Sequence, residues 1–170
     1  NKPVLWSAVE KTALADAEVE YYPHKSVTIW VKFPITAAPQ AELVGAKAVI
    51  WTTTTWTIPG NRAMAFHDDI KYGVYRVDAV AEGSLAQVGE RLVIADETAE
   101  ATAKAAKIES WTREDMDVDL TGVIAQHPLN GQGYDYDVPM FHGDYVTTEQ
   151  GTGLVHIAPG HGFDDWQLAT

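Results

Sequence analysis

Short β-prone segments separated by turn residues are the feature that most limits what this chain can fold into. Apolar side chains at Val27, Ile29, Val31 and Phe33 alternate with other residues, and this period of two is typical of a strand with one buried face. Similar segments occupy residues 47–55, 62–66, 72–80, 91–95, 118–125, 138–142, 144–147 and 153–157. Strands this numerous and short predict a β-rich α+β fold, a closed or nearly closed β-barrel with peripheral helices.

The remaining segments are expected to form a helix, loops and turns between these strands. The alanine-rich stretch 97–107 is the one clear helix, and Asp96 is a suitable N-cap for it. Pro34 and Pro39 predict a loop between them, and the Pro-Gly pair at 59–60 is typical of a type II turn. We expect residues 1–25 to be an arm and linker from a longer parent protein, and residues 26–170 to be the main domain with its C-terminal part truncated.

Charge and composition exclude several classes of protein. The net charge of −12 argues against a protein that grips nucleic acid along its length, but not against a pocket for one nucleotide end. The chain contains no cysteine, which excludes disulfides, thiolate zinc sites and thiol nucleophiles. The sequence has no apolar run of membrane-spanning length and begins with no secretion signal, so we expect a cytoplasmic protein without a membrane partner.

A run of threonines, Thr52 to Thr55 and Thr57, is interrupted only by Trp56. Threonine favours strands, so the run is explained simply by a β-prone strand end. Alternatively, hydroxyls and backbone amides gathered at a strand end hold a ribose, a water molecule or a developing oxyanion. The run alone does not decide between these two interpretations.

A second unusual segment runs from Gly151 to Asp165 and is typical of a strand, a glycine-rich turn and a helix start. His156 lies on the strand and is either a hydrogen-bonded core histidine or part of a site. Asp164 and Asp165 fall where a helix begins, and one carboxylate there is explained by capping. The other, at the mouth of a pocket, is suited to a substrate ammonium group.

These segments contain the residue types of two kinds of catalysis. His156 and His161, with Asp164 or Asp165, are zinc-compatible ligand types, but their spacing matches no familiar metal motif. There is no Gly-x-Ser-x-Gly elbow, and residue 1 is not threonine. A hydrolase built from these residues would therefore use a bound water rather than a covalent intermediate.

Both segments resemble one family. The stretch 52–63, TTTTWTIPGNRA, closely resembles the threonine-rich motif of the inserted editing (CP1) domain of isoleucyl-tRNA synthetases, and 151–165 resembles that domain's second motif. The opening residues 2–7 resemble the segment that leads into this insertion, so the resemblance covers nearly the whole chain. Related valyl and leucyl enzymes carry Thr-Thr-Arg-Pro in the first motif, which favours the isoleucyl branch. Thr55 stands where the family usually has proline.

The resemblance implies a barrel-like editing domain that hydrolyses valine wrongly esterified to the isoleucine tRNA. Asp165 would bind the substrate's ammonium group, and His156 would line the side-chain pocket and exclude isoleucine. Thr52, Thr53 and Thr54 would contact the terminal adenosine and the ester. The catalytic set it implies is Thr52, Thr53, Thr54, Thr57, Asn61 and Asp165, and the substrate-binding set is Thr52, Thr53, Trp56, His156 and Asp165.

The implied partners are the valine-carrying 3′ end of tRNA(Ile) and the rest of the parent synthetase. Editing would need no cofactor and no metal, while ATP and magnesium would serve the parent's synthetic site elsewhere. Two alternatives stay open at this point: a non-catalytic module that binds an aminoacyl group or aminoacyl-adenylate, and a metal-dependent hydrolase.

Overall fold

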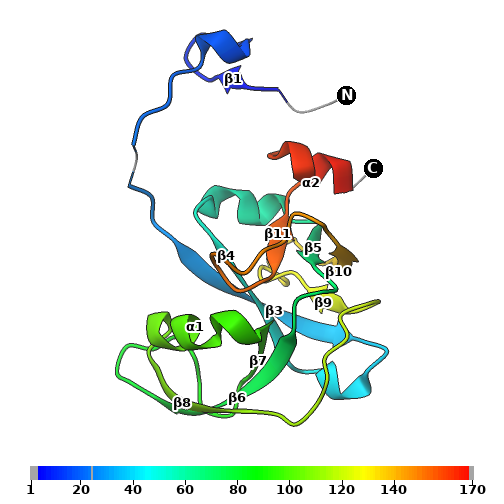
Figure 1. The fold of residues 1–170 in the computed structure, drawn as a ribbon. Helices are drawn as coiled ribbons and strands as arrows, with labels where there is room; N and C mark the ends of the chain where they lie inside the picture. Colours follow the sequence, from blue (N-terminus) through cyan, green and yellow to red (C-terminus); the bar gives the residue numbers. More distant parts are fainter. Residues whose placement is uncertain (1–3, 24, 169–170) are drawn as a thin grey trace.

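The N-terminal part of the chain forms a small hairpin of its own. The computed structural model describes residues 4–23 and 25–168. Strands β1 (Trp6–Ser7) and β2 (Thr12–Ala13) pair antiparallel and are followed by the short 3-10 helix η1 (Asp16–Glu18). In Figure 1 this hairpin lies apart from the other strands.

A nine-stranded mixed sheet makes up most of the structure (Figure 1). Its strands are β3 (Ile29–Ala37), β4 (Lys47–Thr52), β5 (Ala63–Phe66), β6 (Tyr72–Val80), β7 (Arg91–Ala95), β8 (Ile108–Arg113), β9 (Ile124–Gln126), β10 (Asp137–His142) and β11 (Val155–Ile157). The helices are η2 (Ala41–Leu43), η3 (Thr55–Gly60), η4 (Asp96–Thr98), α1 (Ala99–Ala105) and α2 (Phe163–Leu168). The spatial order of the strands in the sheet is β11-β5-β10-β9-β3-β4-β7-β6-β8, with β4 parallel to β7 and β5 parallel to β10.

The sheet curls back on itself. Strand β11 lies against β4, although four strands separate the two in the sheet order. The predicted β-rich α+β class is confirmed. The predicted closure is not found, because no strand pairing within residues 4–23 and 25–168 joins the end strands β11 and β8.

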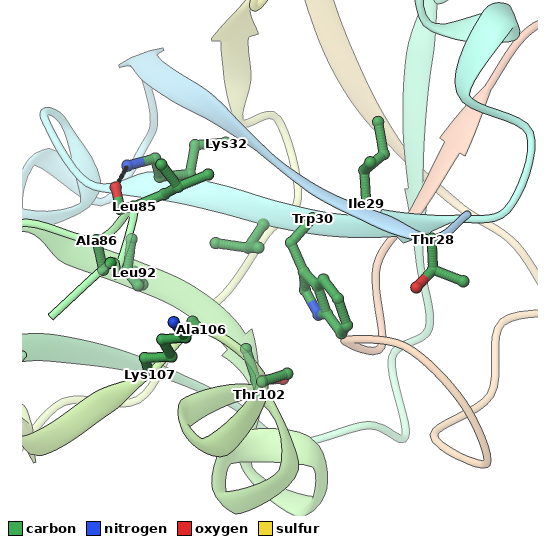
Figure 2. A pocket seen from close by; sticks show the side chains of 13 residues that line it. Thr28, Ile29, Trp30, Lys32, Leu85, Ala86, Leu92, Thr102, Ala106 and Lys107 are labelled. Carbon is green, nitrogen blue, oxygen red and sulfur yellow. Dashed lines mark hydrogen bonds between the residues drawn. The ribbon is translucent and has the colours of Figure 1, made fainter. Parts of the chain in front are cut away.

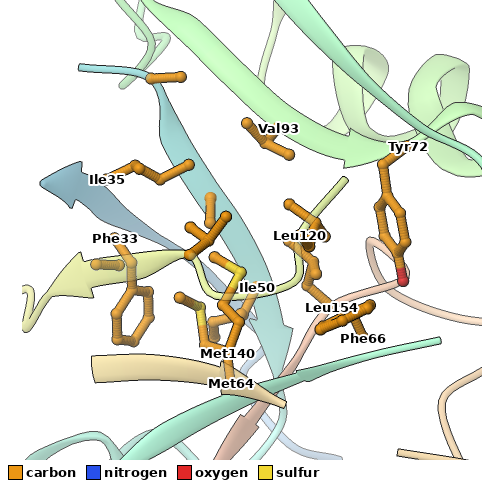
Figure 3. Close-up of a cluster of buried hydrophobic side chains, with 14 of the residues drawn as sticks. Phe33, Ile35, Ile50, Met64, Phe66, Tyr72, Val93, Leu120, Met140 and Leu154 are labelled. Atoms are coloured by element: carbon orange, nitrogen blue, oxygen red, sulfur yellow. The ribbon is translucent and has the colours of Figure 1, made fainter. Parts of the chain in front are cut away.

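A buried apolar cluster fills the inside of the curl. Phe33, Ile50, Met64 and Met140 come from four different strands and are almost completely buried, and Figure 3 shows their side chains converging together with Leu120. A second cluster, which includes Val77, Ile94 and Ile108, packs under α1. These clusters hold the strand ends that carry the polar residues described below. Within the described residues, no helix is both long and apolar enough to cross a membrane.

Two expectations about strands and loops were wrong. Pro34 does not begin a loop but lies inside β3, where it pairs with Lys47 of β4. Its missing N–H is tolerated because the pairing of β3 with β9 begins only at the next residue, Ile35. Residues 144–147, expected as a strand, form a turn at 144–145 and irregular chain at 146–147.

The helix and its neighbour also differ from expectation. The Asp96 carboxylate does not cap the helix; it accepts hydrogen bonds from Arg113 and from the Tyr75 hydroxyl. The helix ends before Lys107, whose φ of 56° breaks it. Strand β8 was missed because its sequence, IESWTR, is largely exposed and polar at the edge of the sheet, and so has little apolar alternation.

Candidate functional site

A cavity of about 320 Å³ lies where the end of β4 meets the chain around β11; we call it the Thr/His cavity. It is lined by Trp51, Thr52, Thr53, Thr54, Tyr145, Thr147, Gln150, Gly151, Gly153, Leu154, Val155, His156 and Asp165. The two segments singled out in the sequence therefore meet in one place, although about a hundred residues separate them.

Backbone and side-chain bonds attach the second segment to the sheet. Strand β11 pairs antiparallel with β5 so that His156 is opposite Met64. Just before it, the Thr152 hydroxyl donates to the Val49 carbonyl at 2.5 Å, and the Tyr72 hydroxyl donates to the Gly153 carbonyl at 2.7 Å. These bonds bring the residues before β11 up against β4 and β6.

The threonine run changes direction at the end of β4. The strand ends at Thr52, whose Oγ1 accepts from the Thr54 N–H at 3.1 Å and lies 3.0 Å from the Thr54 Oγ1. Residues 55–60 then form the 3-10 helix η3 in place of the expected type II turn. The Thr57 hydroxyl donates to the Thr54 carbonyl at 2.8 Å. The Thr57 Oγ1 also lies 3.4 Å from the Thr54 Oγ1, so the hydroxyls of Thr52, Thr54 and Thr57 form one connected group.

His156 joins this group to Asn61. The Asn61 amide nitrogen donates to the Ala63 carbonyl at 2.9 Å and to His156 Nδ1 at 3.4 Å. Nδ1 is therefore an acceptor, and the neutral ring carries its proton on Nε2. That Nε2–H donates to Thr57 Oγ1 at 3.0 Å, which is consistent because the Thr57 proton is used on the Thr54 carbonyl.

The burial of His156 favours this neutral form. Only 8% of the residue is exposed, and desolvation lowers its pKa below 6.5, with the Asp165 charge acting in the opposite direction. Both ring nitrogens are engaged by protein groups. While these bonds hold, His156 has no lone pair to offer a metal ion or to accept a proton from a nucleophile.

Asp165 lies at the start of α2 on the wall of the Thr/His cavity. Its Oδ2 accepts from the Ala158 N–H at 2.8 Å, which fixes the carboxylate across the turn between β11 and α2. Gly162 allows this approach, because a Cβ there would lie 3.1 Å from the Asp165 carboxyl carbon. Burial, followed by the nearby charges of Asp165 and Asp164, raises the pKa of Tyr145 to about 12.

The other predicted site residues fall into three places. Thr53 is exposed and lines the cavity together with Thr52 and Thr54. Thr57 and Asn61 are buried and do not line it; both bond to His156, and Thr57 also bonds to Thr54. Trp56 is 70% exposed and lies outside the cavity wall.

Three polar lining residues were missed from the sequence, namely Tyr145, Thr147 and Gln150. They lie in the irregular segment that precedes β11, and no pattern in that segment distinguishes them from ordinary loop residues. The sequence signal was only their closeness to Gly151, where the second motif begins.

A second cavity of about 300 Å³, the Trp30 cavity, lies between β3 and α1 (Figure 2). Trp30 and Leu92 are among its apolar lining residues, and Lys32 and Lys107 also line it. Among the described residues that line it there is no histidine and no carboxylate. It therefore lacks the imidazole and the carboxylate that the Thr/His cavity has.

Sequence comparison finds close relatives among synthetases. The chain is 54% identical to an isoleucine–tRNA ligase of Caulobacter vibrioides, 50% to one of Gluconobacter oxydans and 48% to one of Agrobacterium fabrum, in each case over 98% or more of its length. It spans about 18% of the length of these relatives. No protein-family model matches the sequence.

A solved structure shares the fold. The crystal structure of GlLeuRS-CP1 superposes with a TM-score of 0.62 at 15% sequence identity, covering 84% of this chain and 58% of that one. At this identity the likeness concerns the fold alone, which is that of a CP1 editing domain. Taken with the sequence relatives, these findings identify the chain as a segment of the isoleucine–tRNA ligase family, with the fold of an editing domain.

Proposed function

We propose that this chain is the editing hydrolase of an isoleucyl-tRNA synthetase, and that it releases valine wrongly esterified to tRNA(Ile). The single observation that carries the proposal is the Thr/His cavity, which Asp165 lines together with Thr52, Thr53 and Thr54. A carboxylate fixed by a backbone N–H suits the substrate's α-ammonium group. The hydroxyls of Thr52, Thr53 and Thr54 suit the ribose and ester of the tRNA's terminal adenosine.

The reaction we propose is direct attack by water. The water oxygen adds to the ester carbonyl carbon, the bond from that carbon to the ribose oxygen breaks, and the water's proton passes to the ribose oxygen. The products are valine and a tRNA with a free 3′ end. Because an aminoacyl ester is already reactive, holding the water and stabilising the oxyanion supply most of what is needed.

The hydrogen bonds around His156 favour water over a threonine nucleophile. The ring presents Nε2–H to Thr57 and so does not accept that hydroxyl's proton. Thr57 is also buried and donates to a backbone carbonyl. We assign Thr57 and Asn61 the task of holding His156, and His156 that of limiting the space for the substrate side chain.

Size exclusion explains why valine is removed and isoleucine is kept. A synthetic site that fits isoleucine cannot strongly reject a residue smaller by one methylene, and the isoleucyl enzyme is itself the standard example of this argument. A second, tighter cavity rejects isoleucine by contact and hydrolyses the valine ester. In this chain we place that contact at His156, which is rigid because both its ring nitrogens are bonded.

We further propose that the step uses no cofactor and no metal at this cavity. The partners would be the valine-carrying 3′ end of tRNA(Ile) and the rest of the parent synthetase, whose synthetic site would use ATP and magnesium. The place of action would be the cytoplasm. The engaged ring nitrogens of His156 support a step without metal.

The test is deacylation by the 170-residue chain of tRNA(Ile) carrying radiolabelled valine or isoleucine. We expect release of valine and protection of isoleucine. Loss of an ammonium–carboxylate bond costs about 1.5–3 kcal/mol, so Asp165→Asn is expected to lower kcat/KM by roughly 10- to 150-fold. The matched control is Asp164→Asn, because Asp164 is exposed and does not line the Thr/His cavity.

The same assay separates the alternatives. Release of isoleucine with retention of valine would contradict the proposal. Binding of a valyl-adenosine analogue without turnover, lost in Asp165→Asn, would indicate a non-catalytic binding module. Activity abolished by a chelator and restored by added zinc would indicate a metal-dependent hydrolase.

A further inference from the structure

Two histidines and two aspartates lie close together at the C-terminal ends of β5 and β10, outside the Thr/His cavity. Strands β5 and β10 run parallel, with His142 opposite Phe66, so the residues that follow the two strands lie at the same end of the sheet. The Gly143 N–H donates to the Phe66 carbonyl at 2.8 Å and holds the two strand ends together. His67 and Asp68 follow β5, while His142 and Asp144 lie at the end of β10.

The side chains of this cluster face one another. The rings of His67 and His142 have their centroids 5.0 Å apart. One ligand atom from each of His67, His142 and Asp144 lies within 4.8 Å of the others. His142 Nε2 is 2.8 Å from Asp144 Oδ1, and its Nδ1 is 3.1 Å from Asp68 Oδ2.

We propose that His67, His142 and Asp144 bind a divalent transition metal such as Zn²⁺, with Asp68 as the group that orients His142. Imidazole nitrogen and carboxylate oxygen are zinc ligands, and three protein ligands with one water make a common zinc geometry. A carboxylate on the far nitrogen of a ligating histidine fixes its tautomer and makes it a stronger ligand. The Asp68 contact with His142 Nδ1 has this arrangement.

Binding requires two small adjustments. Ligands about 2.0–2.1 Å from a tetrahedral ion lie roughly 3.4 Å apart, so Asp144 must move outward slightly, which its 95% exposed side chain permits. His67 Nδ1 accepts from the Asp69 N–H at 3.1 Å, and binding through Nε2 shifts the ring proton to Nδ1 and breaks that bond. Asp69 is exposed, so its N–H can bond to water instead.

The net charge of −12 favours a divalent cation at such an exposed site. A bound ion would join the turns that follow β5 and β10. Tyr145 lines both the Thr/His cavity and the smaller cavity beside His142 and Asp144. The ion would therefore be separated from the proposed editing site by the Tyr145 side chain. Binding of the ion does not depend on the proposed hydrolysis, and a binding measurement alone tests it.

The experiment titrates Zn²⁺ into the 170-residue chain, prepared without a polyhistidine tag, against a chelating indicator dye. We expect one equivalent to bind, and Co²⁺ in its place to give visible absorption bands. His142→Gln and Asp144→Asn are expected to weaken binding at least about tenfold, and Asp68→Asn to weaken it about 10- to 100-fold. Asp144 is almost fully exposed, so its replacement leaves the fold intact.

The control is His161→Gln, a histidine of the second motif outside the cluster, which we expect to bind zinc as the unchanged chain does. Saturating Zn²⁺ is also expected to raise the thermal midpoint by about 5 °C in the unchanged chain but not in His142→Gln. Binding weaker than about 1 mM, or binding unaffected in His142→Gln and Asp144→Asn, would overturn the inference. Loss of binding in His161→Gln alone would overturn it too, by placing the ion at the second motif.

Discussion

Asn61 determines which ring nitrogen of His156 carries the proton. Its amide cannot be turned over, because Oδ1 would then face the Ala63 carbonyl that now accepts from Nδ2 at 2.9 Å. This fixed amide makes His156 Nδ1 an acceptor and leaves the Nε2–H directed at Thr57. The cost is that Asn61 Oδ1 is fully buried with no partner among the described residues. Buried polar atoms without a partner are rare in folded proteins, and at Asn61 this one accompanies the bonds that Nδ2 makes to Ala63 and His156.

Replacing Asn61 with alanine tests this role. The Ala63 carbonyl and His156 Nδ1 would both lose a buried donor, so the free energy of unfolding is expected to fall by about 2–4 kcal/mol. Urea denaturation measures the change. The control is Asn130→Ala at an exposed turn, expected to change it by no more than about 0.5 kcal/mol. Equal effects of the two substitutions would contradict the assignment.

Two buried histidines make stability depend on pH. Burial lowers the pKa of both His127 and His156 below 6.5. His127 Nε2 lies 3.0 Å from the Ile58 carbonyl and its Nδ1 accepts from the Leu129 N–H, so its neutral form is fully bonded. A lowered folded-state pKa means that the unfolded chain binds protons first. The stability is therefore complete above about pH 6.5 and declines as the pH falls below it.

We expect the free energy of unfolding to fall between about pH 7.5 and about pH 5.5, and to fall less in His127→Gln. Urea denaturation at the two pH values measures the difference. His142 acts in the opposite direction, since Asp144 and Asp68 raise its pKa. His142→Gln is thus expected to steepen the decline, and an unchanged pH dependence in His127→Gln would contradict the account.

At the scale of elements, the turn before β11 brings the second motif against the sheet. Gly153 has a φ of 74°, and a Cβ there would lie 2.5 Å from the Ala95 Cβ. Its carbonyl also accepts the Tyr72 hydroxyl. Glycine is needed there both for its conformation and for its small size.

Gly153→Ala is therefore expected to destabilise more than a substitution at another glycine of similar φ. Gly131 has a φ of 81°, and a Cβ there would have no neighbour within 4 Å, so Gly131→Ala carries only the conformational cost of about 1 kcal/mol. Gly153→Ala adds about 1–3 kcal/mol for the overlap with Ala95. Thermal or urea denaturation of the two variants measures this difference. Equal losses of stability would show that the overlap with Ala95 does not affect stability.

Thr55 is the first residue of η3, and this explains how it can stand where the family usually has proline. The N–H groups of a helix's first turn have no partner within the helix, so proline is well tolerated there. We expect Thr55→Pro to stabilise the chain by about 0.4–1 kcal/mol, because it restricts the unfolded state. A loss of stability in urea denaturation would instead show that the Thr55 N–H or its φ matters.

Strands with apolar, β-prone sequences could be predicted from the sequence, and other elements could not. The expected strands at 72–80 and 91–95 match β6 and β7, most of whose apolar residues are buried in the core. Strand β8 and the 3-10 helix η3 were missed because edge pairing and the turn at Thr54 depend on the neighbouring strands. The two site segments were found because their residue types are unusual in themselves.

At the scale of the whole molecule, the curl of the sheet brings the two segments that line the Thr/His cavity together. Strands β4 and β11 lie far apart in the sheet order and meet only because the sheet folds back. No periodicity in the sequence predicts that contact, nor the presence of Tyr145 and Gln150 on the cavity wall. The joint position of Thr52, His156 and Asp165 was expected from the resemblance, and the structure places all three on one cavity.

The most direct test of the central claim is a crystal structure of this chain with a non-hydrolysable valyl-adenosine analogue. The account predicts the analogue in the Thr/His cavity, with its amine hydrogen-bonded to the Asp165 carboxylate, its valine side chain against His156 and its adenosine beside Thr52, Thr53 and Thr54. An analogue bound in the Trp30 cavity, or bound with its amine away from Asp165, would contradict it.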